Sequence, residues 1–518
     1  MGWQDLEDIK QQLTPAEIRF EEARRSIGVG LGPLAFLVIA FLLPPLPEVT
    51  SLGMRTLGIF AWVVIWWITE AIPIPMSGLL GLALLAMCGV FSVTRAFSSM
   101  GHWVILFLLG AFIIAHAMTV SGLNRRFAYR MISFDFIGGN SWRLMVMFLV
   151  AVAMLSSIAS DTVSTVIFMA IGMGLLRALN ISPGSRYGEM LILSIAWAAL
   201  YGGMITPAGS PPNLIGIGLV SDSLDFQIGF ARWMVVGLPM AVLGILVMLA
   251  VIRFSLKDEF GKINIDPEIV RKAREEQGPM TRGEKIAGLG MGTAITLWLT
   301  PDIVNVLLGN THAVSLWIRA HFGGQNVAVV ALLVAASMFL IPINWKEKRF
   351  PLTWNQAAEG IEWGTLALIA GALGIGSALA DPTVGLGNFF ASALGNVAGP
   401  GTSPFIPLFV VVLFMVFMTS FISNNAAISI VAPIVISIGS APGSTLNPLA
   451  AVMAVAMAAS MSVILPCSTP ATAIVFGSGY VRILTMFKKG MILALTGVVM
   501  ATFVAYVIAD FVFPWPTP

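Results

Sequence analysis

Apolar residues occur along this chain in long runs that short polar or charged segments separate. Most runs have about the length that a helix needs to cross a bilayer, which is close to 20 residues. They predict membrane-spanning helices at approximately 29–46, 55–72, 77–94, 102–121, 187–223, 232–252, 286–301, 324–343, 364–380, 445–480 and 489–512. Two further apolar blocks, 143–178 and 403–440, are interrupted midway by polar residues. We expect each of these two to form a re-entrant hairpin that enters the membrane and returns on the same side.

The composition is that of a polytopic membrane protein. Hydrophobic residues make up 57% of the 518 residues and charged residues 10%, whereas soluble domains have about 45–50% apolar and about 25% charged residues. The net charge of +2 offers no basic surface for nucleic acid. The two cysteines and four histidines show no disulfide or metal-site spacing. We therefore expect membrane lipid around the protein, with no nucleic-acid partner and no organic cofactor.

The basic residues predict an orientation in the plasma membrane. With a cytoplasmic N-terminus, 24 of the 28 Lys and Arg residues fall on the cytoplasmic side, where such residues are enriched. Only Arg55, Arg95, Arg232 and Arg319 fall outside. This count holds only if the first hairpin returns to the cytoplasm and the second to the exterior. The C-terminus is then outside.

These features divide the chain into four predicted segments. Residues 1–28 form a cytoplasmic amphipathic segment. The N-terminal half, 29–252, contains the hairpin 143–178 and a helix at 187–223 that prolines break. A charged cytoplasmic linker follows at 253–285. The C-terminal half, 286–518, contains the hairpin 403–440 and a second broken helix at 445–480.

The two halves resemble each other weakly but in the same order. Three pairs of segments align at offsets of 259 to 263 residues: 102–123 with 362–386, 156–165 with 419–428, and 206–215 with 465–474. The alignment matches Ser160 with Ser423 and Ser210 with Thr469. Because the two hairpins enter from opposite sides, the halves form an inverted repeat, which is typical of secondary transporters.

The chemistry at the breaks also favours a transporter. Unwound backbone within a membrane is tolerated where it is buried or lines a cavity. Helix N-termini there attract anions, and free carbonyl, hydroxyl and amide oxygens suit a hard monovalent cation such as sodium. The alternative is that Pro and Ser only kink otherwise ordinary helices. We favour the transporter because the four breaks form two matched pairs, and we find no paired constellation that would indicate an enzyme.

Several motifs resemble those of one transporter family. They are WITEAIPIP at 67–75, LGAFIIAHAMTVSGLNRR at 109–126, the two Ser-Asx hairpin tips and GSPPN at 209–213. The chain resembles the divalent anion/sodium symporter family (solute carrier family 13), which includes bacterial di- and tricarboxylate, citrate and sulfate transporters. The resemblance implies a homodimer of eleven-helix protomers, each with a scaffold domain and a transport domain that moves like an elevator.

The resemblance also implies the site residues. The family has a Ser-Asn-Thr signature at each tip, and here the tips are Ser160-Asp161-Thr162 and Ser423-Asn424-Asn425. The expected substrate-binding residues lie at these tips and at the broken helices: Ser160, Asp161, Thr162, Ser210, Pro211, Ser423, Asn424, Asn425, Thr469 and Pro470. The expected sodium ligands form two sets: Ser156, Ser160, Asp161 and Gly209 in the first, and Thr419, Ile422, Asn424 and Ser468 in the second.

Asp161 departs from the family pattern, which has asparagine at this position. An unpaired carboxylate within a membrane costs several kcal/mol, so Asp161 has three possible roles. It strengthens a sodium site with a full charge, carries a proton, or caps the helix that begins near Thr162. A fixed negative charge also disfavours a highly charged substrate, and no Lys or Arg lies in either tip or break.

The sequence thus predicts an all-α transporter that imports a small anion of the dicarboxylate, sulfate or sulfonate class together with sodium. A sodium-independent anion exchanger, a proton-coupled carrier and a cation/proton antiporter that uses Asp161 are the alternatives.

Overall fold

The computed structural model describes residues 15–515 except 48, 135–136, 138, 258, 261–270, 273, 387–388, 390–400, 442 and 467. The first 14 residues of the predicted N-terminal segment and the middle of the predicted linker therefore lie outside the described residues. Within the described ranges the chain is helical and forms no strand, apart from one isolated bridge between Asn344 and Arg349.

The first half of the chain forms a series of helices that short turns connect. They are α2 (Pro15–Leu37), α3 (Ser51–Thr69), α4 (Ile74–Met87), α5 (Val93–Ser98), α6 (Trp103–Ser121), α7 (Leu123–Ile132), α8 (Ser141–Ala159), α9 (Asp161–Ala178), α10 (Arg186–Gly203), α11 (Pro211–Leu224) and α12 (Phe230–Ser255). Short turns of other helix types lie at η2 (Val38–Leu42), η3 (Ser99–Gly101) and η5 (Pro207–Gly209).

The second half repeats this order. Its helices are α14 (Arg282–Leu308), α15 (Ala313–Phe322), α16 (Val327–Leu340), α17 (Trp354–Glu359), α18 (Trp363–Ala380), α20 (Phe405–Phe421), α21 (Asn424–Gly439), α22 (Pro448–Ala459), α23 (Pro470–Phe476), α24 (Ile483–Val504) and α25 (Asp510–Val512). The turns η6 (Gly324–Asn326), η7 (Pro382–Val384) and η8 (Ala505–Ala509) complete the described part of this half.

Among the described residues, nine helices are long and apolar enough to cross a membrane. A tenth span results if α15 and residues 324–340, which meet at a bend of 54°, count as one. The prediction of an all-helical integral membrane protein is confirmed. The nine include α8 and α9 as separate spans and leave out the shorter apolar helices α4, α20, α21 and α22.

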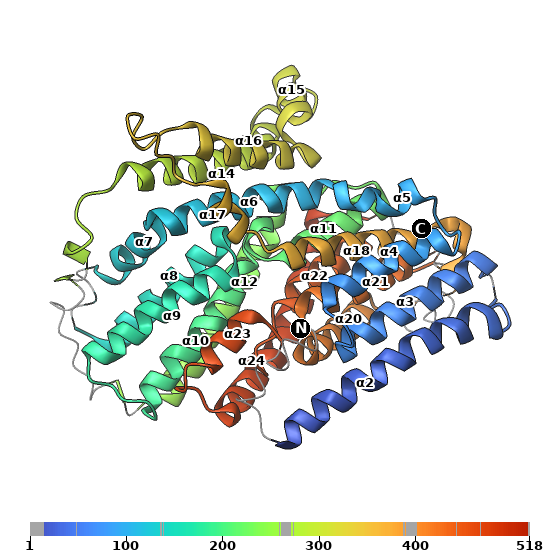
Figure 1. Ribbon diagram of the computed structural model, residues 1–518, viewed down its shortest axis with the longest axis horizontal. Helices are drawn as coiled ribbons and strands as arrows, with labels where there is room; N and C mark the ends of the chain where they lie inside the picture. Colours follow the sequence, from blue (N-terminus) through green and yellow to red (C-terminus); the bar gives the residue numbers. More distant parts are fainter. Residues whose placement is uncertain are drawn as a thin grey trace.

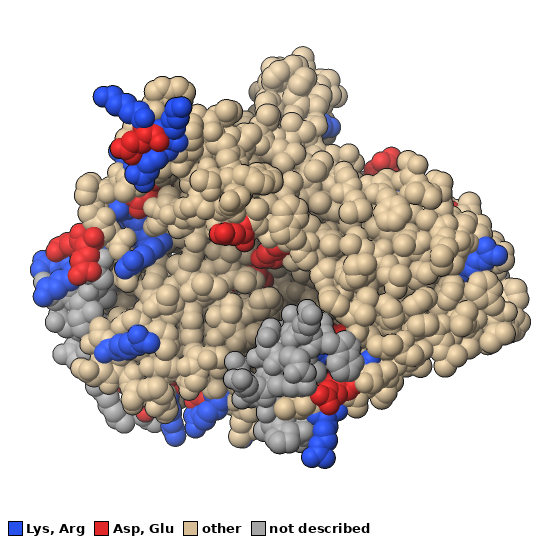
Figure 2. Space-filling view, in the orientation of Figure 1, with Lys and Arg blue, Asp and Glu red and all other residues tan. Residues whose placement is uncertain are grey.

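Figure 1 shows how the helices are arranged around the centre of the molecule. The helices α14, α15 and α16 lie along one edge, next to α6, while α2 and α3 lie side by side at the opposite edge. Helices α8, α9, α10 and α12 form one group, and α11, α21 and α22 occupy the middle. Figure 2 shows a surface that is mostly uncharged, with Lys, Arg, Asp and Glu gathered mainly near its edges, as expected of a protein that faces lipid.

Glycine allows the close packing of two helix pairs. A Cβ atom on Gly371 of α18 would lie 2.5 Å from the backbone of Gly78 in α4. A Cβ atom on Gly110 of α6 would lie 2.6 Å from the backbone of Ala331 in α16. Small residues at such contacts let membrane helices approach closely, and this packing contributes to helix association in lipid.

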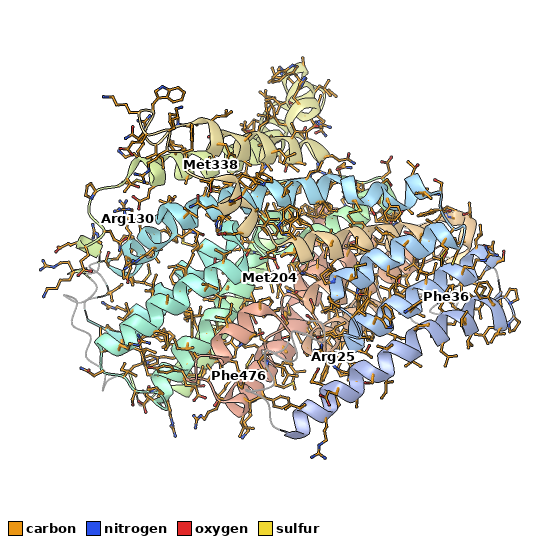
Figure 3. All side chains as sticks on the ribbon, in the orientation of Figure 1. Arg25, Phe36, Arg130, Met204, Met338 and Phe476 are labelled. Carbon is orange, nitrogen blue, oxygen red and sulfur yellow. The ribbon has the colours of Figure 1, made fainter. Side chains whose placement is uncertain are left out.

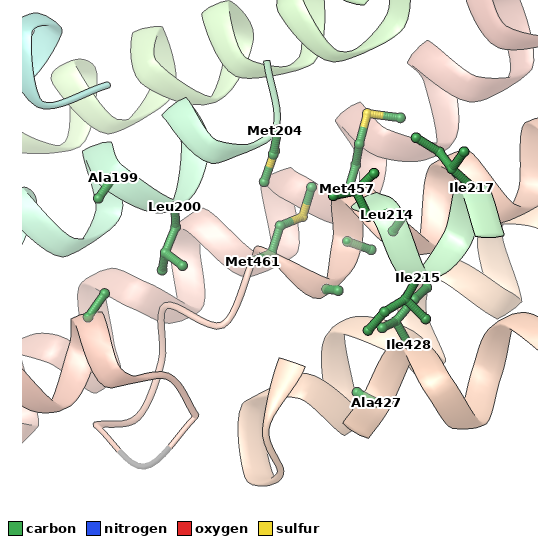
Figure 4. Packing of buried hydrophobic residues seen from close by; sticks show 14 of the residues in the cluster. Ala199, Leu200, Met204, Leu214, Ile215, Ile217, Ala427, Ile428, Met457 and Met461 are labelled. Atoms are coloured by element: carbon green, nitrogen blue, oxygen red, sulfur yellow. The ribbon is translucent and has the colours of Figure 1, made fainter. Parts of the chain in front are cut away.

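The most deeply buried helices are those that lead to the two breaks. Every residue of α10 from Tyr187 to Gly203 is buried, and so is every residue of α22. Figure 3 places Met204, which follows α10, near the middle of the molecule. Figure 4 shows Met204, Met457 and Met461 close to Leu214 and Ile215 of α11. Apolar side chains from both halves therefore surround the breaks and hold them in place.

Candidate functional site

The first tip joins α8 to α9 at Ser160. Ser160 has φ = 70°, which is unusual for a residue other than glycine, and its Oγ accepts a hydrogen bond from the Val163 amide at 3.5 Å. The α9 helix begins at Asp161, with Ser160 as its N-cap. Asp161 Oδ1 accepts hydrogen bonds from the Thr162 amide at 2.7 Å and from Thr162 Oγ1 at 3.3 Å. The carboxylate thus binds the first turn of its own helix.

The second oxygen of Asp161 reaches the break between α10 and α11. Asp161 Oδ2 accepts a hydrogen bond from Ser210 Oγ at 3.4 Å. Both side chains are buried, with Asp161 6% exposed and Ser210 fully enclosed. This contact joins the first tip to the first broken helix, although the two residues are 49 positions apart in the chain.

The second tip joins α20 to α21 through Ile422 and Ser423. Asn424 Oδ1 accepts a hydrogen bond from the Asn425 amide at 2.8 Å, in the same way as Asp161 accepts one from Thr162. The Oδ1 atom of Asn425 is buried and has no hydrogen-bond partner among the described residues. The two tips therefore use the same backbone contact, but only the first one carries a charge.

Each broken helix resumes at a proline. The α11 helix begins at Pro211 and α23 at Pro470, with Ser210 and Thr469 as their N-caps. Proline is favoured at the first helical position because the amide that it lacks would be unpaired there. A Cβ atom on Gly209 would lie 2.6 Å from the carbonyl oxygen of Gly203, so this break requires a residue without a side chain.

One polar side chain after each proline ties the new helix to the preceding loop. In the first half, Asn213 Nδ2 donates to the carbonyl oxygens of Gly203 and Thr206 at 2.8 and 2.9 Å. In the second half, Thr472 Oγ1 donates to the Pro466 carbonyl at 3.2 Å. The resemblance to the symporter family had implied no role at the site for Asn213 or Thr472.

A second pair of matching contacts connects each tip helix to its broken helix. Ser156 Oγ donates to the Ala199 carbonyl at 2.6 Å, and Thr419 Oγ1 donates to the Ala459 carbonyl at 2.8 Å. All four residues are buried. Together with the matching bonds at the tips, these contacts show that the two halves build the same local structure twice.

The helices from the two halves also pack across each other. The α9 helix of the first half contacts α23 of the second, and α21 of the second half contacts α11 of the first. The N-termini of four helices are thus held within one bundle. No Lys or Arg lies in the tips or breaks at 156–165, 204–213, 419–428 and 460–472.

The expected sodium ligands occupy these same places. Ser156, Ser160, Asp161 and Gly209 line the contact between the first tip and the first break, while Ser468 Oγ donates to the Leu465 carbonyl at 2.8 Å within the second break. The structure adds residues that the sequence did not single out. In the tips and breaks, buried oxygens without a hydrogen-bond partner among the described residues belong to Ser164, Asn213, Ser460 and Ser462 as well as to Asn425. These residues lie in the tips and breaks, and this position was the signal by which the sequence could have identified them.

Comparison with known proteins places this geometry in context. Residues 29–515 match a protein family described as the sodium:sulfate symporter transmembrane region. The chain is 30% identical over 489 residues to a sodium-dependent dicarboxylate transporter of Staphylococcus saprophyticus, a match that covers 93% of this chain and 90% of the relative. It is 28% identical over 500 residues to a sodium-dependent dicarboxylate transporter of Staphylococcus aureus, covering 95% and 92%.

Two solved structures share the fold at low sequence identity. The YdaH transporter of Alcanivorax borkumensis aligns with a TM-score of 0.55 and 15% identity, over 89% of this chain and 99% of that one. The MtrF protein of Neisseria gonorrhoeae, described as an antimetabolite efflux pump, aligns with a TM-score of 0.50 and 13% identity, over 93% and 98%.

Proposed function

Because the chain belongs to the divalent anion/sodium symporter family, we propose that it imports a small divalent anion together with sodium across the plasma membrane. The observation that carries the proposal is the pairing of two polar tips with two broken helices, and neither the tips nor the breaks contain Lys or Arg. Such a site has oxygen ligands for a cation and helix N-termini for an anion, but no basic side chain that would hold an anion alone.

The anion is bound, in this proposal, where the four helix N-termini meet. Each N-terminus contributes a partial positive charge. The hydroxyls of Thr162, Ser210 and Thr469 and the amide of Asn425 supply further hydrogen bonds, while Ser423 and the two prolines, Pro211 and Pro470, shape the tips and breaks. Dicarboxylates are the first substrates to test, since the most similar relatives described above are named for them. Sulfate and sulfonates are the other candidates.

The two sodium ions are the co-transported substrates, and their ligands are the two sets that the family pattern implies. The first ion binds near Ser156, Ser160, Asp161 and Gly209, and the second near Thr419, Ile422, Asn424 and Ser468. Asp161 supports this assignment because its carboxylate is buried, accepts hydrogen bonds from Thr162 and Ser210, and forms no ion pair within the described part of the chain. A bound cation would neutralise that charge.

The transport movement is proposed to be that of an elevator within a homodimer, with a cytoplasmic N-terminus and an external C-terminus. The tip helices α8, α9, α20 and α21 would then be re-entrant hairpins, which leaves eleven crossing helices per protomer. The dense contacts among the hairpins and α10, α11, α22 and α23 support a single moving block. The helices α2, α3, α4, α6, α14, α16 and α18 would form the scaffold.

The direct test is uptake of radiolabelled succinate, sulfate and taurine into proteoliposomes. An inward sodium gradient should drive uptake of at least one of them, and replacement of sodium by choline should abolish that uptake. Ser423→Ala should reduce it, while Ser133→Ala, which changes an exposed hydroxyl outside the site, should not. Uptake that is equal in choline would refute sodium coupling.

A proton-coupled carrier is the second candidate, and the buried Asp161 carboxylate is the observation that favours it. In the same proteoliposomes, an inward proton gradient without sodium should then drive uptake, and Asp161→Asn should abolish that uptake. Sodium-driven uptake that persists in Asp161→Asn, with a weaker dependence on sodium, would favour the symporter instead.

A further inference from the structure

A cavity of about 180 Å³ lies beside the first break, which it reaches at Pro207. Its walls come from α11 and the start of α12 on one side, and from α6, α14 and the segment between α15 and α16 on the other. None of the substrate or sodium residues proposed above lines it. Arg232 and Arg319 both line this cavity, and the charge pattern of the sequence predicts that both lie outside the cell.

The inner wall of the cavity is aromatic. The ring of Trp298 lies 4.8 Å from the ring of Phe107 and 5.3 Å from that of Phe230, against which it stacks at 25°. All three side chains are buried. An apolar cavity of about 150 Å³ is large enough to bind benzene, so this cavity has room for one aromatic ring.

The charged groups of the cavity favour an anion. Arg232 is exposed and forms no hydrogen bond or ion pair with the part of the chain that the structure describes. Arg319 donates from one nitrogen, Nη2, to Asn305 Oδ1 at 2.9 Å and to the Asn310 carbonyl at 3.3 Å. The one acid in the lining, Asp302, accepts a hydrogen bond from the Ala231 amide at 2.8 Å. It is therefore already paired with the N-terminus of α12.

We propose that this cavity binds a small aromatic monocarboxylate, with the ring against the wall that Phe230 and Trp298 form and the carboxylate at Arg232. Guanidinium groups bind carboxylates through charge-assisted hydrogen bonds. The walls belong to both blocks that the elevator would move past each other, as the positions of α6, α14 and α16 at one edge of Figure 1 indicate. A bound ligand would hold the blocks together and slow transport. This consequence rests on the proposed function, whereas the binding itself does not.

Binding is tested on the purified full-length protein in detergent by isothermal titration calorimetry, with phenylacetate as the probe. Phenylacetate should bind, while acetate, which lacks the ring, and 2-phenylethanol, which lacks the charge, should bind much more weakly. Loss of a hydrogen bond to a charged group changes affinity by about tenfold or more, so Arg232→Gln should raise the Kd of phenylacetate by about that factor. Arg55→Gln, which removes a different arginine predicted to be external, should not change it.

Two further measurements separate this site from the central one. Val327→Phe should fill the cavity and remove phenylacetate binding while succinate binding persists. In proteoliposomes, external phenylacetate should lower the maximal rate of uptake without changing the KM of the transported anion. Acetate that binds as tightly as phenylacetate, displacement of phenylacetate by the transported anion, or an unchanged Kd in Arg232→Gln would each overturn the proposal. Failure of sodium-driven uptake in the unmodified protein would instead count against the proposed function.

Discussion

Replacing Asp161 by asparagine should separate the effect of charge from that of structure at the first tip. Asparagine keeps an Oδ1 atom that can accept the hydrogen bond from the Thr162 amide. The chain itself provides the precedent, since Asn424 accepts the equivalent bond at the second tip at 2.8 Å. We therefore expect Asp161→Asn to fold normally and to change only the interactions that depend on charge.

The size of that change follows from the contact with Ser210. Ser210 Oγ lies 3.4 Å from Asp161 Oδ2, and a substrate oxygen that accepts the Ser210 hydroxyl proton in place of Asp161 would lie about 2.8 Å from Oγ. The two negative charges would then be about 5 to 6 Å apart, which corresponds to a repulsion of about 3 kcal/mol at an effective dielectric constant of 20. Without sodium, the asparagine variant should bind the anion up to about 100-fold more tightly than the unmodified protein.

The same substitution should weaken the sodium dependence of binding. The unmodified protein needs a cation to neutralise Asp161, so its affinity for the anion should rise steeply with sodium concentration, and that of Asp161→Asn should rise less. Isothermal titration calorimetry at several sodium concentrations measures both effects. Asp225→Asn, which removes an exposed charge outside the site, is the matched control. Identical sodium dependence and anion affinity in the Asp161→Asn and unmodified proteins would refute a role for this charge.

Three further predictions concern contacts outside the central site. The side chains of His102 and Asp222 lie 3.0 Å apart and join α6 of the proposed scaffold to the end of α11 in the proposed moving block. A disulfide bond between cysteines at these two positions should therefore stop the elevator movement, so the double-cysteine variant should be inactive when oxidised and active after reduction. Burial raises the pKa of Asp381, but hydrogen bonds from Thr383 and Arg95 outweigh it, so the pKa lies below its usual value. The stability that the ionised carboxylate contributes should therefore be lost as the pH falls through that pKa, and Asp381→Asn should remove this part of the acid dependence of the melting temperature. Gly371→Ala should destabilise the protein by about 1–3 kcal/mol through overpacking, whereas Gly174→Ala, with open space around it, should not lower the melting temperature.

Local chemistry made the positions of the breaks predictable from the sequence. A proline starts a helix well and continues one poorly, and the helices that follow the two breaks do begin at Pro211 and Pro470. Serine and asparagine side chains cap helices readily, and the tips lie at Ser160 and Ser423. The sequence left capping by Asp161 as one of three roles, and in the structure Ser160, with its positive φ, is the N-cap.

The contacts between distant segments were not predictable in the same way. In a membrane protein, both the lipid-facing and the buried sides of a helix are apolar, so the sequence pattern does not reveal which side faces the core. For this reason the full burial of α10 and α22 had no sequence signal. The bond between Asp161 and Ser210 and the gathering of Arg232 and Arg319 at one cavity likewise depend on how helices pack.

The near-symmetry of the two tips makes the one charged difference between them, Asp161 against Asn424, informative. The paired bonds of Ser156 and Thr419 to neighbouring carbonyls, and those of Asp161 and Asn424 to the next amide, hold the backbone in the same way on both sides. A capping role alone would be met equally well by asparagine, as the second tip demonstrates. The carboxylate at the first tip must therefore act through its charge if it has a role beyond capping. Since that charge is buried beside a proposed anion site, a bound sodium ion or a proton would offset it, and in either case the coupling between the cation and the anion follows from electrostatics.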